Sequence, residues 1–357
     1  MSKDSRLLRL GILGCGPISQ IAHFDAVRKA HNAEIYALCD LADDLRERMA
    51  MIHSPRAVYR RYEDMLEDPL VEAVIIGVAD QYHVPLALQA VNAGKHVLVE
   101  KPLGVNIEEC EMLRARLLER RLVLQIGHNR RFDPGIAFAR RFIREELGQI
   151  MAFKSWYCDS THRYTMTDNL QPIPLLSPQA RRPGGDPKSD KRRYFILTHA
   201  SHLVDTARFL GGELTAVRAR LLERFGAYCW FIETEFASGA LGHLDLTIAV
   251  RGDFEEGFQL YGEHGSVTGK VYLPWFHKSS QVECFSEKDR QYRRPLGEDA
   301  HSYKLQIEGF TNTILQGAPQ HGADIDDGIA SMRALVAIAR SAETGERVRL
   351  ADVSGGL

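Results

Sequence analysis

The apolar positions in the first third of the chain form short continuous runs. Residues 8–13 and 33–39 are such runs, and residues 71–78 (VEAVIIGV) are too apolar for a strand with one polar face. Continuous runs of this length are typical of parallel strands that are buried on both faces. Helical patterns separate them, so the order of elements predicts repeated βαβ units and a doubly wound parallel sheet of the α/β class.

The same alternation continues to the end of a first domain. Helices are expected over 85–92 and 107–118, and further strands over 97–99 and 122–126. Each strand is followed by a helix or by polar residues that end it. We therefore predict an N-terminal nucleotide-binding domain of the Rossmann type over residues 1–128.

From residue 150 the pattern changes to an alternation of apolar and polar positions. Apolar Leu244 and Leu246 alternate with polar Asp245 and Thr247, which is typical of a sheet with one polar or interfacial face. Strands are expected over 150–157, 215–222, 228–236, 240–249 and 257–261, and closing helices over 302–316 and 326–344. A long irregular stretch covers about 160–191. We predict a second α/β domain over 129–357.

A glycine-rich turn, Gly14-Cys15-Gly16-Pro17-Ile18-Ser19, follows the first strand. Gly14 permits a tight turn, and Gly16 lets the backbone approach a pyrophosphate. Pro17 suits the first turn of a helix, whose free N–H groups attract phosphates. Ser19 is a small residue where the dinucleotide fingerprint has its third glycine. We expect Gly14, Gly16, Pro17 and Ile18 to contact a dinucleotide.

Asp40 follows the second strand, a little over twenty residues beyond the glycines. A carboxylate at this place binds the ribose hydroxyls of NAD. Leu41 and Ala42 come next, so no cation directly follows that would bind a 2′-phosphate. The sequence therefore predicts NAD as the cofactor and makes NADP less favourable.

Polar residues also follow the later strands, and ligands of doubly wound sheets bind at that carboxyl edge. His83 comes after the third strand, and Glu100-Lys101-Pro102 ends the run "VLVEKP". An ammonium beside a reacting hydroxyl stabilises developing alkoxide charge, and a buried lysine can also take part in proton transfer. We expect Lys101 to be catalytic and Glu100 to orient it, with His83 near the cofactor. A surface Glu–Lys pair before a proline turn is the alternative.

The stretch "FILTHASHLVDTARFLGG" predicts a helix that begins at about residue 198 or 199. His199, His202 and Asp205 recur every three residues, on or near one face. His202 suits proton exchange with a substrate at neutral pH. The spacing of the two histidines also permits a metal site, but no cysteine or third close carboxylate supports one, so we expect no metal. In a third interpretation the histidines only cap or pack the helix.

Composition and charge narrow the class of function. The 357 residues are 45% hydrophobic, which is enough to bury the cores of two domains. A net charge of -2 gives no broad electrostatic reason to bind nucleic acid or a membrane. Six scattered cysteines are typical of a reducing compartment. The charged start MSKDSRLLRL is unlike a signal peptide, and no apolar run approaches the roughly 20 residues of a membrane span, so we expect a cytoplasmic protein.

Together these motifs resemble the Gfo/Idh/MocA oxidoreductases, a family named after glucose–fructose oxidoreductase, inositol dehydrogenase and a rhizopine-catabolism protein. The resemblance is carried by GILGCGPIS, Asp40, YEDMLEDPLVEAVIIGV, His83, AGKHVLVEKPL, HNRRFDP and YKLQIEGFTNTILQG. It implies a Rossmann domain, a second α/β domain over 129–357 on an open and largely antiparallel sheet that binds substrate and forms oligomers, and a homodimer or homotetramer. It also implies NAD(P)-dependent chemistry on sugars, cyclitols or related polyols, with Lys101 near nicotinamide and substrate and often before a cis proline.

One position departs from the family pattern. The family usually has an Asp, then a His four residues on, then an Asp; His202 and Asp205 match, but Thr198 stands at the first Asp. A threonine carries no charge, and neighbouring His199 is expected to substitute in part. The alternatives to a sugar or cyclitol dehydrogenase are therefore a non-catalytic NAD- and sugar-binding sensor and a reductase of a dihydrodiol-type ring.

Two further residues are expected to bind substrate beside Lys101, Thr198, His199 and His202. Tyr157 is an aromatic that can stack on the apolar face of a carbohydrate ring. Arg130 opens the second domain in HNRRFDP, where it either lies near cofactor or substrate or pairs with acids.

Overall fold

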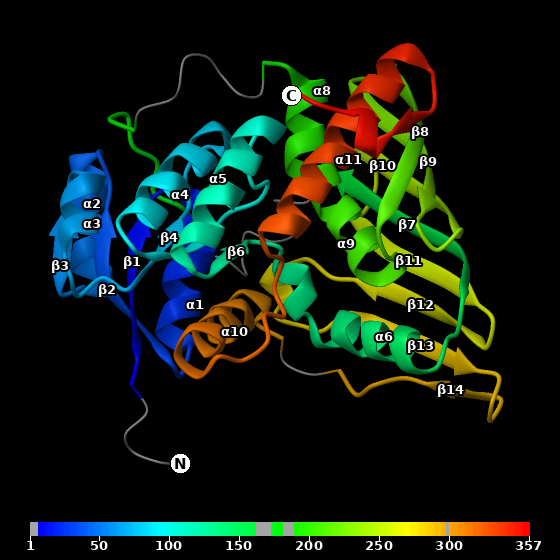
Figure 1. Ribbon diagram of the computed structural model, residues 1–357, viewed down its shortest axis with the longest axis horizontal. Helices are drawn as coiled ribbons and strands as arrows, with labels where there is room; N and C mark the ends of the chain where they lie inside the picture. The colour runs from blue at the N-terminus through cyan, green and yellow to red at the C-terminus, as the bar shows by residue number, and fades with distance from the viewer. Residues whose placement is uncertain (1–5, 162–172, 181–188, 298–299) are drawn as a thin grey trace. The chain divides into compact units, whose positions relative to one another are not determined.

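The computed structural model describes residues 6–161, 173–180, 189–297 and 300–357, and its contacts divide the chain into two units (Figure 1). The chain passes from the first unit to the second after Asn129. The described residues of 171–187 and residues 303–329 group with the first unit, whereas the sequence analysis assigned them to a domain over 129–357. Return segments of this kind leave no local signal, because each contacts a part of the chain far away in sequence.

The first unit is built on a six-stranded parallel sheet in the order β3-β2-β1-β4-β5-β6, which confirms the predicted doubly wound sheet. Its strands are β1 (Leu8–Leu13), β2 (Ala33–Cys39), β3 (Ala57–Tyr59), β4 (Ala73–Ile76), β5 (His96–Val99) and β6 (Leu124–Ile126). The direction of strand order reverses between β1 and β4, and such a switch point at the carboxyl edge is where ligands bind. All four residues of β4 are fully buried, as its apolar run predicted.

The helices that connect these strands are η1 (Ser19–His23), α1 (Phe24–Lys29), α2 (Asp43–His53), α3 (Tyr62–Glu67), η2 (Asp80–Tyr82), α4 (His83–Asn92) and α5 (Ile107–Arg120). The helix α10 (Ser302–Gln316) comes from much later in the chain and groups with this unit from Tyr303 on. The Asn106 side chain accepts a hydrogen bond from Glu109 N at 3.0 Å and so begins α5. The segment η1 is a π-helix, a form that occurs often at functional sites. The sequence analysis did not identify β3, α2 or α3.

The second unit is built on a nine-stranded sheet in the order β14-β13-β12-β11-β7-β10-β9-β8-β15. Its strands are β7 (Ile150–Ser160), β8 (Leu214–Arg224), β9 (Ala227–Phe236), β10 (Leu241–Val250), β11 (Glu255–Gly262), β12 (Gly265–Val271), β13 (Gln281–Ser286), β14 (Gln291–Arg293) and β15 (Val348–Arg349). Neighbours are antiparallel except β7 and β10, which confirms the open and largely antiparallel sheet. In β10, Leu244 and Leu246 are buried while Asp245 and Thr247 are half-buried, as the alternation predicted.

The helices of the second unit include α6 (Pro134–Glu145), which packs on β12 and β13, and α9 (Ser201–Gly211), which packs on β7. Before α9 come α8 (Lys191–Phe195) and the π-helix η4 (Ile196–Ala200). The helical stretch thus begins at Lys191 and not near residue 198. Asp190 caps it by accepting a hydrogen bond from Arg193 N at 3.0 Å, which explains the earlier start.

The remaining helical segments are three short 3₁₀ helices and one long α-helix: η3 (Asn129–Phe132), η5 (Pro274–Phe276), η6 (Leu350–Asp352) and α11 (Ile325–Thr344). The long irregular stretch predicted over 160–191 lies largely outside the described residues. Among the described residues, no helix is both long and apolar enough to cross a membrane.

Candidate active-site residues

The glycine turn after β1 leaves open space beside its backbone. Gly14 has φ of +91°, and a Cβ there would lie 2.6 Å from the carbonyl oxygen of Gly77, so this position requires glycine. A Cβ on Gly16 would meet nothing within 4 Å. Pro17 and Ile18 are the first helical residues after it. An anionic group can therefore approach the backbone N–H groups at this helix N-terminus.

Ser19 explains why a small residue replaces the third glycine of the fingerprint. Its side chain is fully buried, and a Cβ on Gly77 would lie only 2.7 Å from the Ser19 hydroxyl oxygen. The helix therefore lies close against the chain that follows β4. This close approach keeps the glycine turn at the carboxyl edge of the sheet.

Asp40 joins the glycine turn to the end of β2. Its carboxylate accepts hydrogen bonds from Cys15 N at 2.6 Å and from Ala42 N at 2.8 Å. Each carboxylate oxygen has a second lone pair, so the half-buried group can still accept from ribose hydroxyls. Arg46 is a cation that the sequence analysis did not consider, but it donates to Asp40 O at 2.9 Å and to Asp43 Oδ1 at 2.5 Å. The turn and Asp40 together fit a dinucleotide that carries free ribose hydroxyls.

A buried carboxylate lies directly before Lys101. Glu100 Oε1 is 3.1 Å from His23 Nε2, and Glu100 Oε2 accepts from the backbone N of Lys101 at 3.2 Å. Burial raises the pKa of the Glu100 carboxyl, but contact with His23 and the charges of His23, Lys101 and His83 outweigh it, so this pKa lies below its ordinary value. Glu100 is therefore ionised and favours the charged ammonium form of Lys101.

His23 was not identified from sequence, although it completes this group. It is fully buried at the end of η1 and comes from the same helical segment that begins at the glycine turn. No motif marks it, because its partner lies far along the chain. The π-helical form of η1, which points to a functional role of this segment, becomes visible only in the structure.

His83 lies at the carboxyl edge but uses its ring within the fold. The side chain is fully buried, with Nδ1 2.7 Å from Pro102 O and Nε2 3.1 Å from Val78 O. It thereby links the chain after β4 to the Lys101–Pro102 peptide, which is cis as the resemblance implied. A direct contact between His83 and the cofactor stays a prediction.

In the second unit, Arg130, Tyr157 and His202 lie together. The Tyr157 and His202 rings are parallel within 2°, with centroids 6.1 Å apart, and the Arg130 guanidinium carbon is 5.6 Å from the Tyr157 centroid. Arg130 Nη1 lies 3.2 Å from His202 Nδ1. A guanidinium can only donate hydrogen bonds, so Nδ1 accepts and a neutral His202 carries its proton on Nε2.

Glu256 holds Arg130 in this position. Both nitrogens at one edge of the guanidinium contact the two Glu256 carboxylate oxygens, and both side chains are buried. Burial raises the pKa of Glu256, and the charge and hydrogen bonds of Arg130 oppose this rise only in part. Arg130 therefore pairs with an acid, which is one of its two predicted roles, and a contact of Arg130 with cofactor or substrate stays a prediction.

Asp159 supplies a carboxylate where the sequence has Thr198. His199 Nε2 is 3.0 Å from Asp159 Oδ2, and His199 Nδ1 is 2.6 Å from the Thr198 hydroxyl, which also lies 2.6 Å from Tyr194 O. The Asp159 carboxylate therefore faces His199. Sequence reasoning missed Asp159 because the strand β7 extends three residues beyond its predicted end.

Asp205 forms an ion pair with another arginine, Arg131. Arg131 Nη2 and Nε donate to the two Asp205 oxygens at 2.7 to 3.1 Å, and both side chains are buried. This second buried pair stabilises the helix without touching His202 in any described contact. Among the described residues, no group of three or more His, Cys, Asp or Glu side chains is arranged to hold a metal ion.

Comparisons with known proteins show what the chain is similar to. The model of an oxidoreductase family's NAD-binding Rossmann fold matches residues 8–128, and that of the family's C-terminal alpha/beta domain matches residues 193–350. An inositol 2-dehydrogenase of Rubrobacter xylanophilus is 25% identical, covering 93% of this chain and 90% of that protein. A myo-inositol 2-dehydrogenase of Thermotoga maritima is 25% identical, covering 98% of this chain and 100% of that protein. A levoglucosan dehydrogenase solved with NADH has a TM-score of 0.77 at 20% identity, over 97% of this chain and 99% of that chain.

Proposed function

Because the chain belongs to the Gfo/Idh/MocA oxidoreductase family, we propose that it oxidises a secondary hydroxyl of a sugar, sugar derivative or cyclitol with NAD. The observation that carries the proposal is the ionised, buried Glu100 next to Lys101 at the carboxyl edge where the glycine turn lies. Relatives named as inositol dehydrogenases support the substrate class.

When bound, NAD supplies the acceptor for a hydride from the substrate carbon. Gly14, Gly16, Pro17 and Ile18 would hold its pyrophosphate through backbone N–H groups, and Asp40 would accept from its ribose hydroxyls. The half-buried carboxylate of Asp40 would also meet a 2′-phosphate with a like charge.

Exchanging the Asp40 region should therefore change cofactor preference. Asp40→Ser with Leu41→Arg should shift the ratio of kcat/KM for NAD over NADP toward NADP by at least about tenfold, because a like charge is removed and a cation is added. Some loss with NAD is also expected, since the links to Cys15 N and Ala42 N weaken. Asp44→Ser, a nearby exposed acid, is the matched control and should leave the ratio unchanged. A wild-type preference for NADP at equal concentrations would contradict the role of Asp40.

Lys101 is proposed to stabilise charge on the reacting oxygen. The Glu100 carboxylate favours the ammonium form of the lysine, and an ammonium stabilises the alkoxide that forms when the hydroxyl gives up its proton, before the hydride leaves the carbon. His23 in turn shares the Glu100 carboxylate and fixes its position. In this assignment Lys101 binds and polarises the hydroxyl, and Glu100 and His23 act through it.

His202 is proposed to bind the substrate oxygen through Nε2. With Nδ1 accepting from Arg130, neutral His202 offers Nε2–H as a donor. To take up a proton, the ring must first release Nδ1 from Arg130 or change its tautomer. Thr198, His199 and Tyr157 are proposed to line the same part of the substrate site, with His199 oriented by Asp159.

A panel of cyclitols, aldoses and acyclic polyols tests the function directly. NADH formation should be measured by its absorbance, with saturation by at least one member of the panel. Saturable binding of NAD and a sugar without turnover would favour the sensor, which the neutral Thr198 supports. Oxidation of NADH only with a dihydrodiol-type ring substrate would favour the ring reductase.

A further inference from the structure

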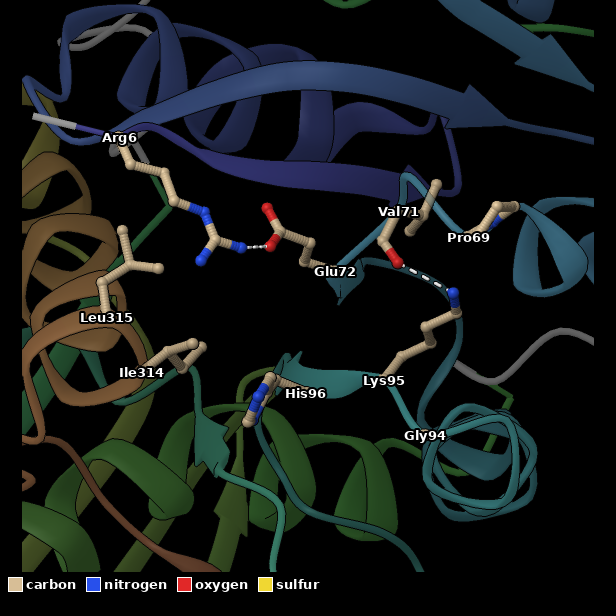
Figure 2. A pocket seen from close by; sticks show the side chains of 9 residues that line it. All are labelled: Arg6, Pro69, Val71, Glu72, Gly94, Lys95, His96, Ile314 and Leu315. Atoms are coloured by element: carbon tan, nitrogen blue, oxygen red, sulfur yellow. Dashed lines mark hydrogen bonds and ion pairs between the residues drawn. The ribbon is translucent and has the colours of Figure 1, made fainter. Parts of the chain in front are cut away.

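A pocket lies at the edge of the parallel sheet opposite the glycine turn. Figure 2 shows this cavity of about 420 Å³ at the point where β1, β4 and β5 begin. The residues that line it are Arg6, Pro69, Val71, Glu72, Gly94, Lys95, His96, Ile314 and Leu315. The amino ends of the strands form it, so it is distinct from the candidate cofactor site at their carboxyl ends.

His96 presents a hydrogen-bond donor to this pocket. Its Nδ1 accepts from Val123 N at 2.9 Å, so the proton of the neutral ring is on Nε2. Burial lowers the pKa of His96, which favours that neutral form. In Figure 2 the imidazole stands across the cavity from the Arg6–Glu72 pair.

Lys95 adds a cation to the pocket lining, and its ammonium group donates two hydrogen bonds in the described structure. The residue is 7% exposed, and Nζ donates to Asp68 O at 2.7 Å and to Val71 O at 2.8 Å. An ammonium has three N–H donors, so one is left over.

The one carboxylate in the lining is already neutralised. Glu72 forms an ion pair with Arg6 and accepts from Arg9 N at 3.1 Å, with Arg9 Nε at 3.2 Å from the same oxygen. Arg6 retains further N–H groups on a largely exposed guanidinium. Arg6, Lys95 and His96 thus offer N–H donors around the cavity, and the cations Arg6 and Lys95 outnumber the acid.

Ile314 and Leu315 of α10 line the cavity together with Val71 and Pro69, but most of the surface exposed to the cavity is polar. We propose that the pocket binds a small carboxylate anion on the N–H groups of His96 and Arg6. This site is separate from the proposed dehydrogenase chemistry and does not depend on it.

Calorimetric titration of the full chain with butyrate at low salt tests the proposal. We expect saturable binding with a Kd of about 1 mM, which is ordinary for so small a ligand. His96→Phe removes the donor but keeps a ring, and Arg6→Met removes the cation; each should weaken butyrate binding about tenfold. Arg114→Met is the matched control, because Arg114 is an exposed arginine of the same unit that is paired with Asp326.

Two further measurements keep the test sharp. NAD affinity and thermal unfolding should be unchanged in each variant, which separates a lost pocket from a lost fold; should His96→Phe unfold, Arg6→Met still tests the site. Absence of saturation with butyrate would overturn the proposal. Equal weakening by Arg114→Met would do the same, since it would indicate general attraction of anions.

Discussion

Replacing Lys101 with alanine should lower kcat by about 10²- to 10⁴-fold, the range typical of groups that act on the reacting atoms. The ammonium next to ionised Glu100 would be lost, and only the neutral N–H donor proposed for His202 would remain to stabilise charge on the substrate oxygen. NAD affinity should stay within a small factor, because the glycine turn and Asp40 do not depend on this side chain. Steady-state kinetics and a separate NAD titration measure the two effects.

Two further variants show whether the loss of activity in Lys101→Ala is specific to this lysine and to its geometry. Lys29→Ala removes an exposed lysine that is paired only with Asp25, and it should leave kcat unchanged. Lys101→Arg keeps the charge but changes its geometry, so it should retain more activity than alanine and less than the wild type. A loss of less than about threefold in Lys101→Ala would assign Lys101 to the turn before Pro102 and not to the chemistry.

The elements that were predicted correctly depend on local pattern. The continuous apolar run of β4 and the alternation of β10 reflect burial on two faces or one, and burial is encoded residue by residue. The glycine turn was also readable, because Gly14 needs a positive φ and Gly16 needs an open side. Short strands such as β3 and β15 have too few residues to express either period.

The partners of the site residues could not be predicted in the same way. His23, Asp159 and Glu256 each meet a group that lies far along the chain, and no spacing rule connects them. The missing acid at Thr198 therefore looked like a plain loss, whereas β7 provides a carboxylate to the neighbouring His199. Sequence spacing reports only neighbours on one element.

The helical stretch that carries His199, His202 and Asp205 shows that spacing is an incomplete guide even along one stretch of chain. A period of three predicted one face shared by His199, His202 and Asp205. The three side chains instead meet Asp159, Arg130 and Arg131. His199 belongs to the π-helix η4, and a π turn changes the register between the residues before and after it.

The Arg130–Glu256 pair provides the second large expected effect. Arg130→Met should lower the free energy of unfolding by about 3–5 kcal/mol, because it leaves the buried Glu256 without its partner. The double variant Arg130→Met/Glu256→Leu should recover most of this loss. Urea unfolding measures both, and the recovery would show that the cost comes from the unpaired carboxylate.

The loss should also depend on pH in a definite direction. Burial already raises the pKa of Glu256 in the intact pair, and removal of Arg130 should raise it further. A carboxyl with a raised pKa in the folded state favours folding below its unfolded pKa and loses that contribution as pH rises through the folded pKa. Arg130→Met should thus be closer to the wild type at about pH 5 than at about pH 8, whereas the double variant should show no such dependence.

The same variant tests the state of His202. Arg130→Met removes the hydrogen bond that Arg130 Nη1 donates to His202 Nδ1, so nitrogen-15 NMR of the histidine rings should show His202 shifting from the Nε2–H tautomer toward Nδ1–H. Arg131→Met is the matched control: it breaks a second buried bidentate pair, with Asp205, and should destabilise the protein to a similar degree while leaving the His202 tautomer unchanged. If Arg131→Met shifts the tautomer as much as Arg130→Met does, the change reflects a loosened helix. If neither variant shifts it, Arg130 does not determine the tautomer, and the proposed link between Arg130 and the Nε2–H form of His202 is wrong.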